Sequence, residues 1–273
     1  MQNTHGVEMS CLSDMGRARS ENQDSILVDP AHGLFILADG AGGGQGGGTA
    51  SRVTVDSMAA ALKPVYRKLL RFPFWNSKAR IPRLTQFLCD AAQAANRAVW
   101  DRAAAAPDLT GMASTLVAGV IDVHRCISIT AGDSRIYRFH ESRLEQISRD
   151  HSLSRSLIDQ GFFSEGDSGA AKYRNVLTQA VGMQDNIEVS TYDFPVEDDD
   201  LILVCSDGLT NMVSDENIAS ILSTAGSLED KAEALIRNAN EAGGLDNISV
   251  VLARRNNPPS FWSRLLGLRF TTQ

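Results

Sequence analysis

The sequence contains no run of about 18 consecutive apolar residues, the minimum that a membrane-spanning helix needs. Its first ten residues, MQNTHGVEMS, also lack the basic segment and following apolar stretch of a secretory signal. We therefore expect no transmembrane segment, no export and a cytoplasmic location.

Paired cysteines are missing as well, because the 4 cysteines are far apart and none belongs to a Cys-x-x-Cys motif. Most of them lie in apolar segments, where a free thiol behaves as a small hydrophobic side chain. This distribution favours a reducing compartment.

Basic residues are too few for a general nucleic-acid binder, since 26 Lys and Arg stand against 33 Asp and Glu, a net charge of −7. Bound cations would neutralise part of that acidity. The 43% apolar content of the 273 residues is enough for one substantial core. From the charge we expect no nucleic-acid partner, and from the apolar content one domain over residues 1–255 with a tail over 256–273. We also expect a monomer.

Hydrophobic periodicity predicts strands mixed with helices. Strands are expected over residues 9–13, 25–29, 34–38, 114–123, 126–130, 135–140, 143–148, 189–194, 201–205 and 248–254. Helices are expected over about 49–65, 84–104, 152–160, 214–223 and 228–241, and a loop over 161–174. Short turns between neighbouring strands indicate antiparallel pairing. The predicted class is therefore α+β, a four-layer α-β-β-α sandwich of two mainly antiparallel sheets flanked by helices.

Four aspartates each adjoin a short apolar run, and each is therefore expected where a strand meets a loop. They are Asp39 after LFILA, Asp133 after ISITAG, Asp207 after LILVCS and Asp246 before NISVVLA. A lone buried carboxylate is costly, whereas several carboxylates together can hold a hard divalent cation. We expect the four to converge around Mg²⁺ or Mn²⁺.

Five motifs in order resemble those of the metal-dependent protein phosphatases of type 2C, in their compact bacterial form. They are DMGRARSENQD at 14–24, ADGAGG at 38–43, AGDSR at 131–135, SDGL at 206–209 and DNIS at 246–249. NVLT at 175–178, with Gly182, matches a further segment of that family, and the likeness covers roughly residues 8–254.

The resemblance implies a protein serine/threonine phosphatase that hydrolyses phosphoserine and phosphothreonine by direct attack of a metal-bridging water. Its cofactors would be two Mn²⁺ or Mg²⁺ ions, with the third metal seen in bacterial members. Its substrates would be phosphorylated proteins, the targets of a Ser/Thr kinase. The sequence has no Cys-x5-Arg nucleophile loop, which agrees with hydrolysis that forms no phosphoenzyme.

By the same resemblance, Asp39 bridges the two metals and the carbonyl of Gly40 binds the first. Asp207 and Asp246 would bind the second metal, and Asp24 would act through coordinated water. These positions are the expected metal site.

Two further roles follow from the resemblance. Asp133, together with Asp207, would hold the third metal. Arg19 would grip the substrate phosphate, for which the planar guanidinium fork is well shaped. We therefore expect Arg19 and Asp39 to be the catalytic residues.

The sequence departs from family patterns at two positions. Ala41 stands where larger eukaryotic members often have a histidine proposed as the acid for the leaving group. Gln23 stands where many members have Glu, so a water-mediated link to the metals loses a charge. His151 is the histidine that could replace the missing acid, but we expect its segment to begin a helix.

The glycine run at 40–48 permits a different interpretation, because residues 42–47 satisfy the G-x-G-x-x-G pattern of dinucleotide sites. A dinucleotide-binding oxidoreductase also needs a second parallel strand that ends in an acidic residue, whereas here the helix leads into the basic segment 63–83. The remaining alternative is a binding module that kept the fold and lost the reaction, although all five acidic positions are present.

Two segments keep open alternatives. The basic segment 63–83 is either a solvated helix face and loop or a docking surface for an acidic or phosphorylated partner. In the tail 256–273, FWSRLLGLRF could form an amphipathic helix that packs on the domain or contacts a partner or membrane surface.

Overall fold

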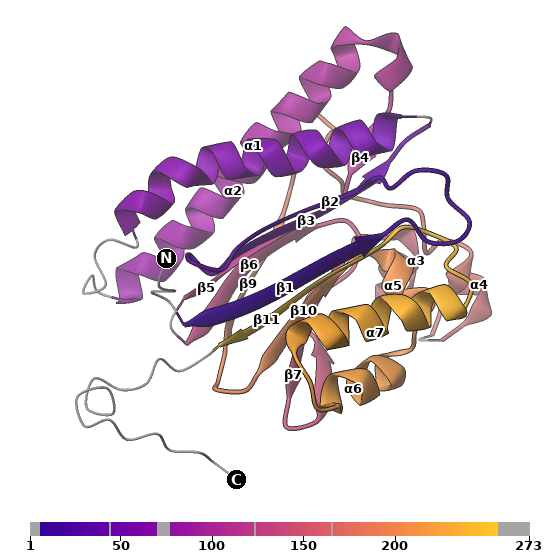
Figure 1. Ribbon diagram of the computed structural model, residues 1–273. Helices are drawn as coiled ribbons and strands as arrows, with labels where there is room; N and C mark the ends of the chain where they lie inside the picture. Colours follow the sequence, from indigo (N-terminus) through magenta and orange to yellow (C-terminus); the bar gives the residue numbers. More distant parts are fainter. Residues whose placement is uncertain (1–5, 44, 70–76, 123, 165, 256–273) are drawn as a thin grey trace, which may run out of the picture.

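The computed structural model describes residues 6–43, 45–69, 77–122, 124–164 and 166–255. The predicted tail and the middle of the basic segment, 70–76, lie outside the described residues. Two sheets lie face to face, with long helices on the outer side of each (Figure 1). This arrangement confirms the predicted four-layer α-β-β-α sandwich.

Each sheet is assembled from strands that are far apart in the sequence. The β1 sheet has five strands in the order β1 (Val7–Asp14), β11 (Ile248–Arg255), β10 (Leu201–Cys205), β7 (Arg135–His140) and β8 (Arg143–Gln146). The β3 sheet has six: β2 (Asp24–Asp29), β3 (Leu34–Ala41), β5 (Leu116–Asp122), β6 (Arg125–Ala131), β9 (Ser190–Pro195) and the short β4 (Ala113–Ser114), which pairs with β3. Every pairing between the described strands is antiparallel.

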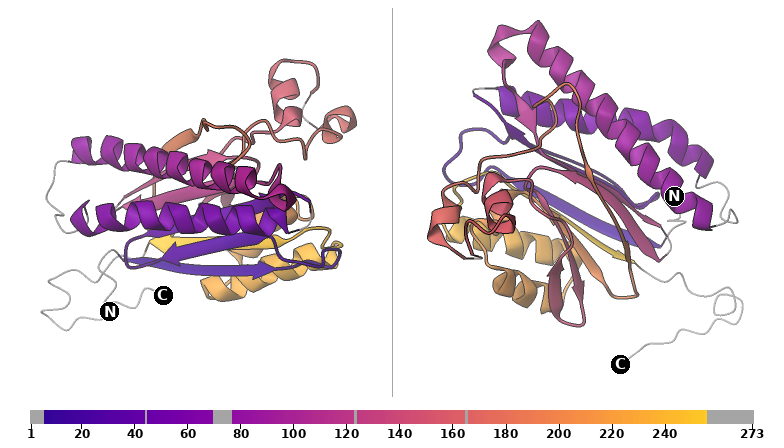
Figure 2. Two further views of the ribbon diagram at one scale, coloured as in Figure 1. Left: turned by 90° about the horizontal axis from the view of Figure 1, so that it is seen from above. Right: turned by 180° about the vertical axis from the view of Figure 1, so that it is seen from behind.

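Helices cover the outer face of each sheet. Helices α1 (Gly46–Leu69) and α2 (Ser77–Ala105) cover the β3 sheet, and α6 (Asp215–Ser223) and α7 (Leu228–Glu241) cover the β1 sheet. Shorter elements are η1 (Pro107–Leu109), α3 (Leu153–Asp159), α4 (Ser168–Ala171) and α5 (Asp207–Thr210). Helices α3 and α4 project at one end of the sandwich (Figure 2).

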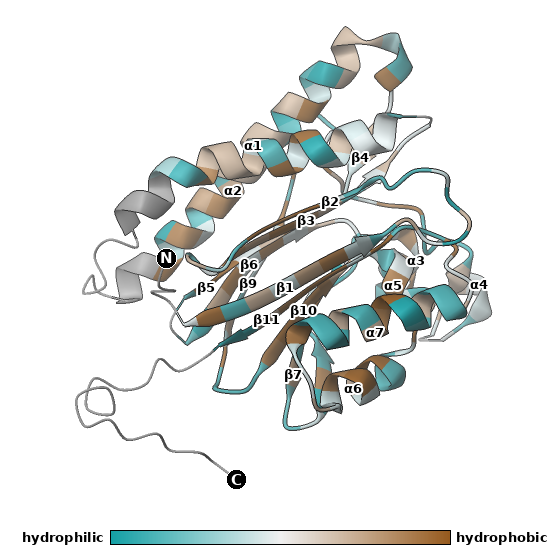
Figure 3. Cartoon of the chain, viewed as in Figure 1, coloured by the Kyte–Doolittle hydropathy of each residue, from teal (hydrophilic) through white to brown (hydrophobic). Residues whose placement is uncertain are grey.

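Alternation along β3 shows how the core is built. Leu34 and Ile36 pack toward α1 and α2, whereas Phe35 and Leu37 pack between the two sheets. Both faces of the strand are buried, which explains its continuous apolar run (Figure 3). Since side chains alternate with a period of two, the next odd residue, Asp39, points toward the space between the sheets.

Several local predictions are wrong, among them the start of α2, which lies at Ser77 and not near residue 84, and the single strand over 114–123, which is divided into β4 and β5. Strand β3 continues through Ala41, so Asp39 lies inside a strand, because β2 and β4 pair with this extension. Helix α1 starts at Gly46, within the glycine run, because its packing on β3 and β2 outweighs the low helix propensity of glycine. The expected loop 161–174 contains α4, whose N-terminus is capped by Asp167 and which is too short for a periodic pattern. None of the helices in the described ranges has the length and apolar character needed to cross a membrane.

Candidate active site

A cavity of about 230 Å³ lies where β3, β6 and β10 end and β11 begins. It brings together predicted site residues from both halves of the chain. Those that line it are Arg19, Asp39, Gly40, Asp133, Asp207 and Asp246. The predicted convergence of four aspartates is therefore present, whereas Asp24 does not line the cavity.

Asp24 and Asp39 are direct partners in the antiparallel pairing of β2 with β3. The hydroxyl of Ser206, which follows β10 in the other sheet, donates to Asp24 Oδ2 at 3.0 Å. The second oxygen of Asp24, Oδ1, is fully buried and has no hydrogen-bond partner. An acceptor left unsatisfied in this way is costly unless a donor or a cation supplies the missing contact.

Burial and mutual repulsion raise the carboxyl pKa values at this site. Burial, followed by the neighbouring Asp24 and Asp207, raises the pKa of Asp39 well above its ordinary value. Burial raises the pKa of Asp24 to about 6 and that of Asp133 to about 7, with Asp207 adding to both. Burial and the adjacent Asp246 also raise the pKa of Asp207. Such a group of carboxylates is stable in its ionised form only with positive charge among them.

Two of the four aspartates hold protein partners. Asp246 Oδ2 accepts a hydrogen bond of 2.7 Å from Arg19 Nη2, and Asp207 Oδ2 accepts one of 2.9 Å from Asn211 Nδ2. Within the described ranges, no three Asp, Glu, His or Cys side chains are already arranged as ligands of one ion. Because each carboxylate oxygen has two lone pairs, Asp246 could keep its contact with Arg19 and still offer a lone pair to a metal.

The donor set fits a hard divalent cation. All the candidate ligands are oxygens, one of them an orphaned buried carboxylate oxygen, and the surrounding acids repel one another. Oxygen-only sites are typical of Mg²⁺ and Mn²⁺. The residues present therefore suit the metals expected from the sequence.

The glycine run serves close backbone packing between β3 and the start of α1. A Cβ at Gly40 would lie 2.0 Å from the carbonyl oxygen of Gly47. A Cβ at Gly47 would lie 2.4 Å from Gln23 Oε1 and 2.7 Å from the carbonyl oxygen of Gly40. The strands on either side of this turn are antiparallel, so the parallel unit of a dinucleotide site is absent from the described chain.

Asn247, a residue of the DNIS motif, has a role that was not predicted from the sequence. Its side chain donates to the carbonyl oxygens of Met15 and Glu21 and accepts from the backbone N–H of Gln23. Asn247 thereby ties the segment that carries Arg19 to the start of β11. The signal available in the sequence was an asparagine directly after an expected ligand.

Thr115 is a second residue that the sequence did not reveal. It lines the cavity, and its Oγ1 accepts a hydrogen bond from the backbone N–H of Asp39 at 2.9 Å. The same oxygen shares a hydrogen bond with the hydroxyl of Ser134. Nothing in the local pattern distinguishes this threonine from any other strand threonine.

His151 has a structural role. The backbone N–H of Gly132 donates to its Nδ1, and its Nε2 is hydrogen-bonded to the hydroxyl of Ser190. The next residue, Ser152, caps α3, as the prediction of a helix start required. Burial lowers the pKa of His151, and the side chain does not line the cavity.

Comparison with known proteins identifies the family. A family model described as protein phosphatase 2C matches residues 16–251. The serine/threonine phosphatase Stp of Listeria welshimeri is 34% identical over 247 residues, which are 89% of this chain and 94% of the relative.

Solved structures agree with this match. The serine/threonine phosphatase PstP/Ppp of Mycobacterium tuberculosis has a TM-score of 0.80 at 29% identity, over 92% of this chain and 99% of that chain. The catalytic domain of PstP, solved in complex with two manganese ions, has a TM-score of 0.78 at 29% identity, over the same shares of the two chains.

These matches confirm the expected fold and the expected class of enzyme, a protein serine/threonine phosphatase. They cover nearly all of the described chain, including the segments that carry all seven predicted site residues. The chain belongs to the protein phosphatase 2C family.

Proposed function

We propose that this protein removes phosphate from phosphoserine and phosphothreonine side chains of proteins by direct hydrolysis with Mn²⁺ or Mg²⁺. The observation that carries the proposal is that one arginine and four carboxylates line one cavity of about 230 Å³. A phosphate monoester is an anion that repels nucleophiles, and its uncatalysed hydrolysis is extremely slow. A site of this kind therefore needs cations to bind the ester and protein groups to orient it.

Five residues would hold the two central metals. Asp39 would bridge them, the carbonyl oxygen of Gly40 would bind the first, and Asp207 and Asp246 would bind the second. Asp24 would act through coordinated water, which would also satisfy its orphaned Oδ1. When bound, such ions lower the pKa of water and stabilise the charge that develops during an in-line displacement.

Asp133 would hold a third metal together with Asp207. Its burial and its place in the cavity lining support this role. The pKa of Asp133 is raised to about 7, with Asp207 the second cause after burial, so the two carboxylates lie close enough to repel each other. A cation between them would relieve that repulsion.

Arg19 would bind and orient the substrate phosphate. One of its terminal nitrogens contacts Asp246, and a guanidinium group carries five N–H donors in a planar fork. The remaining donors can reach phosphate oxygens in the cavity that Arg19 lines. Bidentate binding would fix the ester oxygens relative to the carboxylates and so set the line of attack.

The cavity lining supports water as the nucleophile. Among the described residues that line it there is no cysteine, serine or histidine. The hydroxyl of Thr115 is hydrogen-bonded to the backbone of Asp39 and to Ser134, so it is held away from an attacking position. With Ala41 at the position of the eukaryotic histidine, the leaving oxygen would take its proton from water.

The decisive experiment measures phosphate release from a phosphothreonine peptide in the presence of Mn²⁺, Mg²⁺ or a chelator. We expect release with either metal and none with the chelator. An Asp39→Asn variant serves as the matched control for a contaminating phosphatase. A wild-type protein that binds metal and peptide but releases no phosphate would instead be an inactive binding module.

We further propose that residues 1–255 form the catalytic domain and residues 256–273 a tail. The protein would act as a monomer in the cytoplasm, on targets of a Ser/Thr kinase. The serine/threonine phosphatase named among its bacterial relatives supports phosphoprotein substrates. Light scattering should give the mass of one chain. Deletion of the gene that encodes the protein should raise the phosphorylation of the kinase targets.

A further inference from the structure

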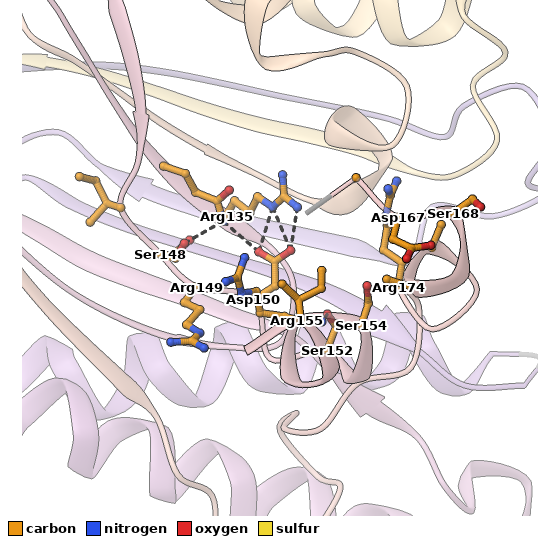
Figure 4. Close-up of a pocket in the computed structure, with 16 residues that line it drawn as sticks. Arg135, Ser148, Arg149, Asp150, Ser152, Ser154, Arg155, Asp167, Ser168 and Arg174 are labelled. Carbon is orange, nitrogen blue, oxygen red and sulfur yellow. Dashed lines mark hydrogen bonds and ion pairs between the residues drawn. The ribbon is translucent and has the colours of Figure 1, made fainter. Parts of the chain in front are cut away.

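Of two further cavities, one shares lining residues with the catalytic cavity and the other shares lining residues with the first. The first, which we call the adjoining cavity, has a volume of about 340 Å³ and shares Arg19 and Asp246 with the catalytic cavity. The second, the arginine cavity, has a volume of about 600 Å³ and lies between the end of β8, α3 and α4 (Figure 4). Arg174 lines both, so it stands at their junction.

Three of the four arginines in the arginine cavity already have carboxylate partners. Arg135 makes a bidentate contact with Asp150, in which Nη2 lies 2.7 Å from Oδ2. Arg149 and Arg155 both pair with Asp159. Their charges are largely used within the fold, and they offer little to an incoming anion.

Arg174 differs from these three. Its side chain is exposed, and its Nη1 donates to the neutral amide oxygen of Asn211 at 3.3 Å. In the described chain it forms no ion pair with a carboxylate. Asp167 lines the same cavity but accepts from the backbone N–H of Gly169 at the start of α4. Arg174 is therefore a cation with unused donors, and it lines the same cavity as the expected metal ligand Asp246.

Part of the wall of the adjoining cavity is apolar. Leu245 is 61% exposed, although it directly precedes the predicted ligand Asp246. A Cβ at Gly243 would lie within 3.9 Å of both the Leu245 side chain and Met212 Sδ, which places these two side chains together. Arg19, the other arginine of this cavity, is paired with Asp246, which leaves Arg174 as its unpaired cation. A site with one unpaired cation and one apolar wall suits an acidic side chain, whose methylene groups contact the wall while its carboxylate reaches the arginine.

We infer that Arg174 is a specificity residue that pairs with an acidic side chain next to the phosphoresidue of the substrate. The inference rests on the proposed function, because the adjoining cavity opens from the phosphate site through Arg19 and Asp246. The surrounding aspartates would repel an acidic peptide, so a cation in this position decides whether such a peptide is accepted. The occupant is a segment of the phosphoprotein itself.

The test compares phosphothreonine peptides of equal length that carry Glu, Gln or Lys on either side of the phosphoresidue. With Mn²⁺ present, we expect kcat/KM of the full-length protein to be about 3- to 10-fold higher for Glu than for Gln, the range of one charge-assisted contact at a partly exposed site. Arg174→Gln should remove this preference, and Arg174→Glu should reverse it in favour of Lys. Arg174→Lys should retain part of it, because the charge remains.

The control is Arg143→Gln, which removes an exposed arginine of β8 outside both cavities and should leave the Glu:Gln ratio unchanged. Because the readout is a ratio on one enzyme preparation, a general loss of activity cancels. A wild-type protein without preference for Glu, or an equal preference in Arg174→Gln, would overturn the inference. Failure to release phosphate from any peptide would instead contradict the proposed function.

Discussion

Asp24 and Asp39 face each other across the β2–β3 pairing, with their side chains toward the space between the two sheets. Like charges directly opposite each other on neighbouring strands destabilise a sheet, and here both residues are also buried. The protein therefore maintains, at this position, an arrangement that favours a bound cation over the empty, ionised site. Stability and catalysis should respond in opposite directions when either charge is removed.

Asp39→Asn should nearly abolish phosphate release and, in chelator, raise the thermal unfolding midpoint. The amide keeps the shape of the side chain but removes a buried charge that Asp24 and Asp207 repel. Each kcal/mol gained would raise Tm by about 2–4 °C for a chain of this size. Calorimetry with and without Mn²⁺ checks the result, and the stabilisation by Mn²⁺ should shrink. Near-normal turnover at saturating metal would show that Asp39 is not a bridging ligand.

In chelator, the protein should lose stability as the pH rises from about 5 to 8. The folded-state pKa values of Asp24 (about 6) and Asp133 (about 7) are above the ordinary value of 3.8, so the folded state holds more protons in this interval. Deprotonation therefore favours unfolding, and the stability present at low pH is lost as the pH passes these values. Saturating Mn²⁺ should flatten the curve. A chelated protein whose Tm is constant or rises over this range would contradict the prediction.

Arg19→Ala should raise KM for phosphopeptides while metal binding stays intact or becomes a few-fold tighter. The substitution removes the phosphate clamp and releases Asp246 from its 2.7 Å contact. Because the Arg19 side chain is 54% exposed, the lost ion pair is worth at most about 1 kcal/mol, or roughly fivefold in affinity. Calorimetric titration with Mn²⁺ measures the second effect. Metal binding that collapses while KM stays fixed would make Arg19 a structural residue.

Gly47→Ala should reduce both stability and activity, whereas Gly43→Ala should be tolerated. A methyl group at Gly47 would lie 2.7 Å from the Gly40 carbonyl oxygen and 2.4 Å from Gln23 Oε1, so β3 and α1 would have to separate. At Gly43 the added Cβ meets nothing within 4 Å. We expect about 1–3 kcal/mol of destabilisation at Gly47 and less than about 0.5 kcal/mol at Gly43. Equal effects at the two positions would refute the close-packing role of the glycine run.

His151→Ala should lower stability by about 1 kcal/mol, because it removes the contacts with Gly132 and Ser190. It should leave the dependence of rate on leaving-group pKa unchanged. A series of substituted phenyl phosphates measures that dependence in wild type and variant. A dependence that is shallow in the wild type and much steeper in the variant would identify His151 as the general acid.

The local pattern of residues determined much of this protein. Alternation and apolar runs located the strands within a few residues. A strand buried on one face has apolar residues at every second position, and a strand buried on both faces has a continuous apolar run. Helix α7 follows its predicted range because its apolar periodicity and its Ser227 capping box are both local signals. The aspartates beside β6, β10 and β11 were also visible, since each adjoins such a run.

Only the tertiary structure decided which of these residues meet. Arg19 and Asp246 are 227 positions apart and come into contact because β1 pairs with β11 and the segment after β1 folds over the start of β11. The pairing of Asp24 with Asp39 depends on strand register, and the donation from Ser206 to Asp24 depends on how one sheet lies on the other. Arg174 lies at the junction of two cavities, and this position too depends on tertiary packing. Periodicity records which face of an element is buried, but contacts between distant elements depend on the packing of the whole sandwich, which no short segment of sequence encodes.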